Sequence, residues 1–399
     1  MKPLLTVFID GLKPESVEHM PFLSTFSTKR KIVSELGYSS TCHASMYSGV
    51  HPNKHLDWFL LKYSPGTSPF MWIKRTGLYR SPDNIYTKYT CHKLTRFLYK
   101  DTSFFGLSLL LLWTPLKYWS YFDSTEKKFF TEKGFLGDYP TIFELLRIEG
   151  IPFDIAGVAY YPEESTKAIE RYSFNKIKPW TYLFIGDVDP YSHKYGQDSV
   201  ETIRKIREID NVLEKSYRLF ESSFDDFYFM CFSDHGHIDI KEEINLNSLF
   251  RSCGRLLKDY IHIIDANYAR FWFKNERERN EVFRVLSEIS DKGFILTEEH
   301  FKKYNINMPD NRYGDLIFYL NAPHIFYHEK IFAMGKQRST TYRSMHGYIP
   351  DQPNYNGVFI SNEKIQNHSC IELVDIMPSI LHLFGIKIPK YVDGKVLWK

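Results

Sequence analysis

The chain has 399 residues, enough for one large α/β domain with insertions or for two domains. Its 51 Lys and Arg residues nearly balance its 48 Asp and Glu residues, so bulk charge argues against a nucleic-acid-binding protein. The 5 cysteines are odd in number and contain no C-x-x-C pair, which argues against a zinc knuckle or a redox couple and favours a reducing compartment.

Two apolar segments bear on location. Residues 1–10 hold only a short apolar run before Asp10, unlike a signal peptide, so we expect a cytoplasmic protein. The longest apolar run, Phe104 to Trp113, is shorter than the roughly 20 residues that span a bilayer, and no transmembrane segment is expected. It predicts a buried helix, with a membrane-surface element as the alternative.

Apolar runs alternate with segments of helical period along the chain. The runs predict four buried parallel strands, at Leu4 to Ile9, Tyr182 to Ile185, Phe227 to Phe232 and Val358 to Ile360. Helical periodicity covers residues 139–149, 199–220 and 370–384. This order predicts an α/β fold with a doubly wound, mostly parallel sheet flanked by helices.

Ionisable residues follow three of these strands. Asp10 follows the first, Asp187 and Asp189 follow the second, and Asp234 and His235 follow the third. Ligands of doubly wound sheets bind beyond the carboxyl ends of the strands, so we expect these side chains to converge at one edge.

Two segments break the alternation, at residues of about 56–135, which are rich in aromatic residues, and of about 240–330. No repeat, charge block or Gly/Ser linker marks a domain boundary. We therefore expect one catalytic domain over 1–399, with both segments inserted as a cap that selects the substrate.

Carboxylates and imidazoles are the ligands that a divalent cation such as Zn²⁺ takes from a protein. Asp189 and His193 are four residues apart, a spacing at which a turn or helix start aims both at one ion. Asp234 and His235 are adjacent, and Gly236 after them permits a tight backbone path. His237 and the histidines outside these motifs are expected to have structural roles only.

The order of these motifs resembles the type I phosphodiesterase and nucleotide pyrophosphatase branch of the alkaline phosphatase superfamily, nearly from end to end. In that family a Ser or Thr nucleophile precedes His, Gly, Pro and His at +4, +10, +13 and +16. Counting from Ser39, rather than from Ser40 or Thr41, gives His43, Gly49, Pro52 and His55. Ser344 to Gly347 resembles the family's last ligand segment.

The resemblance implies two divalent metal ions and a serine nucleophile. One metal would be held by Asp189, His193 and His346, and the other by Asp10, Ser39, Asp234 and His235. Zn²⁺ is the first choice and Mn²⁺ the alternative. Asp187 is an alternative carboxylate ligand, although only Asp189 has the His four residues later.

The family fold implies a phosphoric ester hydrolase that forms a phosphoseryl intermediate on Ser39. An Asn that nucleotide pyrophosphatases carry at +21 is replaced here by Leu60, which argues against nucleotides as the substrate. We expect a phosphate-ester substrate that is nucleotide-, glycan- or lipid-linked. Two alternatives stay open: a phosphotransferase that passes the phosphoryl-linked group to a sugar or lipid hydroxyl, and a non-catalytic metal-binding homologue.

Overall fold

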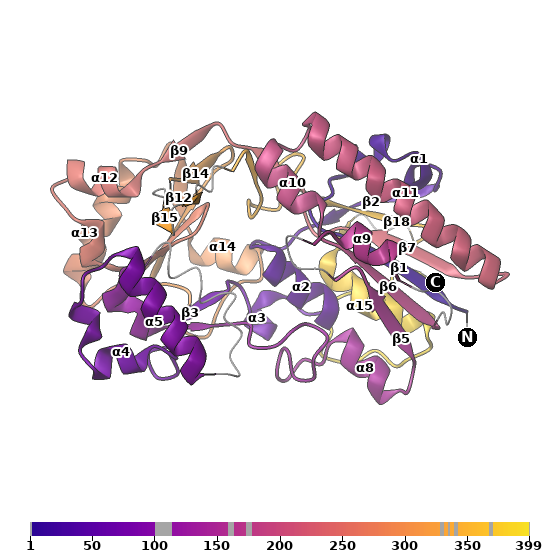
Figure 1. Ribbon diagram of the computed structural model, residues 1–399, viewed down its shortest axis with the longest axis horizontal. Coiled ribbons are helices and arrows are strands. Elements are labelled where there is room, and N and C mark those ends of the chain that lie inside the picture. The colour runs from indigo at the N-terminus through magenta and orange to yellow at the C-terminus, as the bar shows by residue number, and fades with distance from the viewer. Residues whose placement is uncertain are drawn as a thin grey trace. The chain divides into compact units, whose positions relative to one another are not determined.

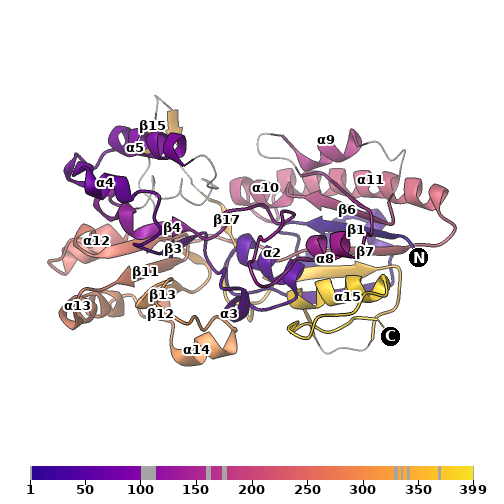
Figure 2. The same cartoon turned by 90° about the horizontal axis from the view of Figure 1, so that it is seen from below.

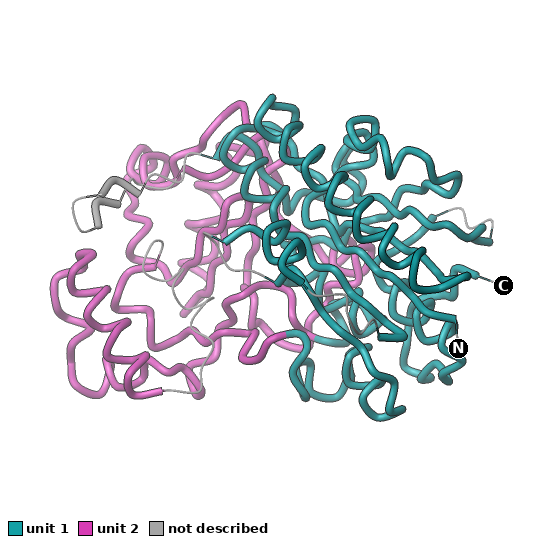
Figure 3. The backbone as a smooth tube through the Cα atoms, turned by 45° about the vertical axis from the view of Figure 1, so that its right-hand side comes forward, with its two compact units in different colours: residues 1–55, 130–239, 342–399 teal, residues 56–129, 240–341 magenta. Residues whose placement is uncertain are grey.

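The computed structural model describes residues 2–99, 114–158, 163–172, 178–327, 331–333, 336–338, 342–366 and 370–398 (Figures 1 and 2). The apolar run Phe104 to Trp113 lies outside the described residues, so both alternatives for it stay predictions. The chain divides into two compact units (Figure 3). Unit 1 comprises residues 1–55, 130–239 and 342–399, and unit 2 comprises residues 56–129 and 240–341. Whether unit 2 acts as a cap stays a prediction.

Unit 1 is built on a seven-stranded sheet. Its strands, in spatial order, are β19 (Ile371–Glu372), β2 (Thr28–Val33), β18 (Gly357–Ser361), β7 (Tyr228–Phe232), β1 (Leu4–Ile9), β6 (Trp180–Ile185) and β5 (Phe153–Ala156). Every neighbouring pair is parallel except the two pairs that β18 makes, which are antiparallel. The mostly parallel sheet is confirmed, but the prediction that Val358 to Ile360 forms a parallel strand was wrong.

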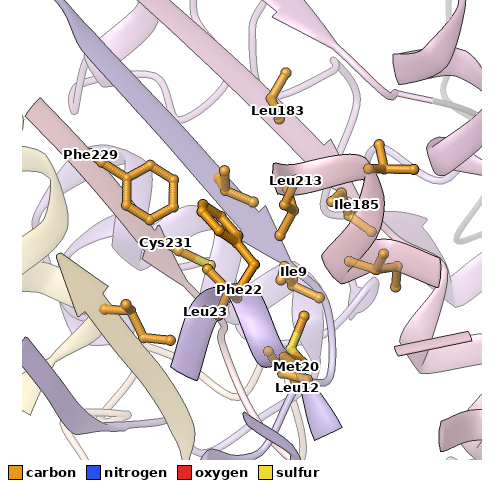
Figure 4. Close-up of a cluster of buried hydrophobic side chains, with 14 of the residues drawn as sticks. Ile9, Leu12, Met20, Phe22, Leu23, Leu183, Ile185, Leu213, Phe229 and Cys231 are labelled. Atoms are coloured by element: carbon orange, nitrogen blue, oxygen red, sulfur yellow. The ribbon is translucent and has the colours of Figure 1, made fainter. Parts of the chain in front are cut away.

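The central strand β1 is buried at every position, which explains its continuous apolar sequence. Successive side chains point to opposite faces of the sheet. Leu5, Val7 and Ile9 join a cluster with residues of β6, β7, α1 (Pro21–Ser24) and α11 (Val200–Ser223). Figure 4 shows part of this cluster, with Ile9 near Leu213. The predicted helix 199–220 is confirmed, since Ser199 caps α11 by accepting from the backbone of Thr202 at 3.2 Å.

Helices α2 (Ser39–Ser48), α8 (Ile142–Ile148) and α15 (Ile376–Leu383) belong to the opposite face of the sheet. On that face the Phe8 ring lies 5.2 Å from the His43 ring, and Phe143 of α8 stacks on Trp180 of β6. In Figure 2, α15 lies on one side of β1, β6 and β7, and α9 (Ser165–Glu170) and α11 lie on the other. The sheet is therefore covered by helices on both faces.

The two other predicted helices are shorter than expected. The segment 139–149 becomes α8, which begins after a capping box formed by Thr141 and Glu144. The segment 370–384 was predicted as one helix, and its first part is not helical. Ile371 and Glu372 pair with β2, and η6 (Leu373–Asp375) precedes α15.

The remaining elements of unit 1 are short. They are η1 (Pro14–His19), α3 (Pro52–His55), α10 (Val188–Tyr195), β8 (Ile238–Asp239) and β17 (Ser344–Met345).

Unit 2 contains a four-stranded antiparallel sheet. Two clusters of buried apolar side chains, drawn from both chain segments of the unit, include residues of this sheet. The strand order is β10 (Ile261–Ile264), β11 (Tyr268–Trp272), β13 (Leu316–Leu320) and β12 (Gly293–Ile295). Helices α12 (Leu246–Ser252) and α13 (Glu276–Ser287) pack in one cluster. Residues of β3 (Leu61–Tyr63), α4 (Met71–Arg75), α5 (Ile85–Leu98), η3 (Leu116–Tyr121) and β4 (Phe122–Ser124) form the other.

Buried Arg270 joins the two segments of unit 2. Its guanidinium pairs with Asp265 at 3.0 Å and donates to the carbonyl oxygen of Leu61 at 2.9 Å. The other elements of unit 2 are η2 (Leu78–Arg80), β9 (Glu242–Ile244), η5 (Leu257–Asp259), α14 (Glu298–Lys303), β14 (His324–Phe326), β15 (Ile331–Ala333) and β16 (Lys336–Arg338). Within the described ranges, none of the helices has both the length and the apolar character that a membrane crossing requires.

Candidate metal centre

The ends of three adjacent parallel strands place the first candidate residues. β1 lies between β6 and β7 in the sheet. Asp10 directly follows β1, and Asp234 and His235 follow β7. Asp189 and His193 lie one turn apart in α10, shortly after β6, so both project from the same side of that helix. The expected convergence at one sheet edge is what the structure shows.

Ser39 reaches the same place from the first turn of α2. Its Oγ lies 2.9 Å from Nε2 of His235. Gly37 makes the turn before the helix possible, because a Cβ there would lie only 2.5 Å from Oγ1 of Thr41. A helix N-terminus favours negative charge, so this position suits both an anionic substrate and an ionised serine.

The spacing that selected Ser39 has a structural basis in α2. Gly49 ends the helix in a left-handed conformation with φ of +70°. Pro52 begins α3, and Nε2 of His55 hydrogen-bonds Oγ of Ser45 at 3.1 Å. His43 instead lies at the site, where a ring nitrogen is within 4.8 Å of oxygens of Asp10 and Asp234. Sequence reasoning used His43 as a motif position and gave it no role.

One half of the site is acidic, and we call Asp10, Ser39, Asp234, His235 and His43 the acidic half. Nε2 of His235 lies 3.6 Å from Oδ1 of Asp10 and 3.3 Å from Oδ2 of Asp234. Burial raises the pKa of Asp234 to about 8, against hydrogen bonds from the backbone N–H groups of Gly11 and His235. Burial and the charge of Asp234 also raise the pKa of Asp10 well above its usual range.

The other half gathers imidazoles around one carboxylate, and we call Asp189, His193, His237 and His346 the imidazole half. Oδ1 of Asp189 lies 3.2 Å from Nε2 of His193, 3.0 Å from Nε2 of His237 and 3.4 Å from Nε2 of His346. Burial acts to raise the pKa of Asp189, but the attraction of His193 and hydrogen bonds from His193 and His237 hold it well below its usual range.

The two halves adjoin each other. The rings of His235 and His346 stack with their centroids 4.0 Å apart. One nitrogen of each ring and an oxygen of Asp189 lie within 4.8 Å of one another. All seven residues predicted as ligands are therefore brought together in unit 1.

Two sequence interpretations change with the structure. His237 was expected to have a structural role only, yet it is buried at the site and contacts Asp189. The available signal was its position two residues after His235 at the end of a strand. Asp187, the alternative ligand, instead accepts hydrogen bonds from the backbone of Ser165 and Thr166 at the start of α9.

Comparison with known proteins supports the resemblance to the phosphodiesterase family. Residues 161–349 match the family model of type I phosphodiesterase/nucleotide pyrophosphatase. This match covers slightly less than half of the chain and agrees with the resemblance that the motifs show. The match includes Asp189, His193, Asp234, His235 and His346. A search of curated proteins gives no match.

Solved structures of ectonucleotide pyrophosphatase/phosphodiesterase 5 share the fold. An inactive murine variant in complex with AMP has a TM-score of 0.66 at 12% sequence identity, covering 99% of this chain and 98% of that one. The human protein has a TM-score of 0.64 at 14% identity, covering 99% of this chain and 97% of that one.

Members of the phosphodiesterase family normally depend on divalent metals, and the residues present here fit such ions. Oδ1 of Asp10 and Oδ2 of Asp234 are buried and have no hydrogen-bond donor among the described residues. Burial lowers the pKa of His235 to about 4 and that of His43 to about 3, so both rings are neutral near pH 7 and carry a free lone pair. Buried carboxylates need a compensating positive charge, which cations would provide.

The position of the family's missing Asn belongs to unit 2. Leu60 stands there, and its carbonyl oxygen accepts a hydrogen bond from the backbone of Thr125 at 3.0 Å. A leucine side chain offers no donor to a phosphate oxygen.

Proposed function

We propose that the chain is a metal-dependent phosphoric ester hydrolase that works through a phosphoseryl intermediate on Ser39. The observation that carries the proposal is the position of Ser39 Oγ. It lies at the start of a helix, 2.9 Å from His235, within a cluster of buried carboxylates and neutral imidazoles that also contains Asp10 and Asp234. A serine activated by a single general base would not require this number of buried carboxylates and imidazoles around it.

The residues of each half have distinct tasks in this proposal. Asp10, Asp234 and His235 would hold one divalent ion beside Ser39, and Asp189, His193 and His346 would hold the other. Bound divalent ions would lower the pKa of the serine hydroxyl and neutralise charge on the phosphoryl oxygens. Zn²⁺ is the proposed metal because imidazoles form half of the ligand set.

His235 orients the nucleophile through its ring. Its Nδ1 lies 3.2 Å from the carbonyl oxygen of Gly236, which can only accept, so Nδ1 carries the proton. Its Nε2 lone pair then faces the hydroxyl of Ser39. Without metal this hydrogen bond holds Oγ within the acidic half, and a bound ion would take the same Nε2 lone pair and hold Ser39 Oγ in turn.

Two displacements at phosphorus complete the proposed reaction. Ser39 Oγ forms a bond to phosphorus while the bond to the first alcohol breaks, and that alcohol leaves with a proton. Water then attacks the phosphoseryl group, which restores the serine hydroxyl and releases the phosphorylated product. The N-terminus of α2, where Ser39 lies, would favour the negative charge of a phosphoryl group bound there.

The proposed substrate is a phosphodiester whose organic part is nucleotide-, glycan- or lipid-linked. The murine neighbour binds AMP, which supports a nucleotide as one member of this group. The absence of an amide at Leu60 supports the other two. We also propose a cytoplasmic location, which the five free thiols support.

Hydrolysis of two chromogenic esters tests the proposal. Metal-free protein would be resupplied with Zn²⁺ or Mn²⁺ and assayed with bis-p-nitrophenyl phosphate and p-nitrophenyl phosphate. We expect metal-dependent turnover with a preference for the diester, and none in Ser39→Ala. Turnover only after a sugar or lipid hydroxyl is added would identify a phosphotransferase instead. Metal binding without any turnover would identify a non-catalytic homologue.

A further inference from the structure

His237 belongs to the site by position and lacks a role in the ligand set above. It follows β7 by five residues and is 2% exposed. Its Nε2 lies 3.0 Å from Oδ1 of Asp189, and its ring centroid lies 4.7 Å from that of His193. A Cβ added to Gly11 would lie 3.0 Å from the same Nε2. The imidazole is therefore held closely on more than one side.

The hydrogen bonds of Ser344 fix which nitrogen of His237 carries the proton. The Ser344 hydroxyl lies 2.7 Å from the carbonyl oxygen of Ser192, which can only accept, so the single hydroxyl hydrogen is directed there. Oγ of Ser344 also lies 3.2 Å from Nδ1 of His237. Because its hydrogen is already used, Oγ accepts from Nδ1, so Nε2 is the nitrogen of His237 that can give up its proton and bind a cation.

The same residue orients His193. The carbonyl oxygen of Ser344 lies 2.9 Å from Nδ1 of His193 and accepts its proton. Nε2 of His193 then also faces Asp189, at 3.2 Å from Oδ1. Ser344 therefore directs two imidazole nitrogens toward one carboxylate oxygen. Outer hydrogen bonds of this kind are what hold metal-binding imidazoles in orientation.

Without metal, protons lie between the Asp189 oxygen and these imidazole nitrogens; once the protons are lost, three lone pairs face one another and a cation among them would remove the repulsion. The ligand atoms of Asp189, His193 and His237 all lie within 4.8 Å of one another. In a tetrahedral zinc site with bonds of about 2.0–2.1 Å, neighbouring ligand atoms are about 3.3 Å apart. The separations of 3.0 and 3.2 Å from Asp189 are close to that spacing.

We propose that His237 is a further ligand of the metal that Asp189 and His193 hold, and that Ser344 is the positioning residue for both imidazoles. This inference rests on the proposed metal-dependent function. It makes the imidazole half richer in nitrogen, and nitrogen ligands favour Zn²⁺ over Mn²⁺. The imidazole half would then select Zn²⁺ more strongly than the acidic half does.

Metal binding by His237→Asn tests the assignment without relying on activity. The amide N–H of an Asn side chain can still donate to Oγ of Ser344, but Asn has no atom that could replace Nε2 as a metal ligand. The matched control is His262→Asn in unit 2, because His262 is also buried and donates from Nδ1 to a backbone carbonyl, that of Tyr260 at 2.9 Å. Ser344→Ala, which keeps His237 and removes its orienting oxygen, is the second variant.

Zinc stoichiometry and affinity would be measured on the full chain by chelator competition, together with the visible absorption of the Co²⁺-substituted protein. We expect His237→Asn to weaken one of two sites by about 100-fold or more and to change the Co²⁺ band, and Ser344→Ala to weaken it about 10-fold. Both changes should leave the other site intact, and His262→Asn should match the wild type.

The outcomes separate this inference from the proposed function. Two wild-type sites that are unchanged in His237→Asn would overturn the role of His237 and leave the hydrolase proposal standing. A weakened site in a protein that hydrolyses neither ester would support His237 as a ligand and overturn the hydrolase. A wild-type protein that binds no metal would overturn both.

Discussion

The acidic half and the imidazole half of the site are both buried, yet burial has opposite results for their carboxylates. In the acidic half, Asp10 and Asp234 have raised pKa values because burial and the charges of neighbouring carboxylates disfavour their own charge. In the imidazole half, the histidines keep the pKa of Asp189 well below its usual range. A cation would relieve repulsion between carboxylates in the first half and would replace the protons that the imidazoles share with Asp189 in the second. The two halves therefore offer different chemistry to the same kind of ion.

The largest expected effect separates catalysis from metal binding in the acidic half. We expect Ser39→Ala to lower kcat by at least about a thousandfold, because it removes the nucleophile. Metal content, measured by plasma mass spectrometry, should still show two ions. Ser40→Ala is the control, since Oγ of Ser40 is buried and has no hydrogen-bond partner among the described residues. Equal losses in both variants would show that Ser39 is not the nucleophile.

The raised pKa of Asp234 predicts an unusual pH dependence for the metal-free protein. The folded state holds a proton on this carboxyl up to about pH 8, whereas the unfolded chain releases it near pH 4. The folded state therefore binds more protons, and stability falls as pH rises between these values. Buried neutral histidines such as His235 act in the opposite direction, so the test is the Tm of the wild type relative to that of Asp234→Asn in chelator, which should fall between pH 5 and pH 8.

Asp234→Asn should remove the contribution of Asp234 to that pH dependence, while that of Asp10 stays, and raise the metal-free Tm at pH 8, because one buried charge is gone. Asp189→Asn should do neither, since the pKa of Asp189 is lowered. The comparison would fail if the two variants changed the Tm profile equally.

Asp187 provides a smaller and purely structural test beside the imidazole half. Asp187→Ala removes the acceptor for the backbone of Ser165 at 2.7 Å and of Thr166 at 2.9 Å. We expect a loss of about 1–3 kcal/mol in the free energy of unfolding, measured by denaturant titration. Zinc affinity should not change, and a lost zinc ion would show that Asp187 is a ligand.

The smallest expected effect probes the contact beside His237. Gly11 has φ of +76°, and an added Cβ would lie 3.0 Å from Nε2 of His237. Gly11→Ala should cost about 1 kcal/mol of stability from backbone strain and also weaken zinc binding by the imidazole half. Gly77→Ala is matched, with φ of +79° and no atom within 4 Å of the added Cβ. If both variants bind zinc alike, the contact with His237 is unimportant.

The sequence was informative where one local pattern determines structure. The run Leu4 to Ile9 is strand β1 as predicted, because a strand buried on both faces needs apolar side chains throughout. The strand-end rule then located Asp10, Asp189 and Asp234 at one edge. Spacing selected Ser39, since Gly49 and His55 are needed to end and hold α2.

Other features depend on contacts between distant residues, and no local pattern reports them. An apolar run does not encode strand direction, so the antiparallel pairing of Val358 to Ile360 was missed. The short strand pairing of Ile371 with Ile32 was also missed, because the apolar residues of 370–384 follow a helical periodicity. His237 was missed because its partners, Asp189 and Ser344, lie far away in the chain.

The central claim is that two metal ions occupy these two halves. Crystals grown with Zn²⁺ and measured at the zinc absorption edge would test it most directly. The account predicts two anomalous peaks about 4 Å apart, one beside Asp10, Asp234 and His235 and the other beside Asp189, His193 and His237. Peaks elsewhere, or none among these residues in crystals saturated with zinc, would contradict it.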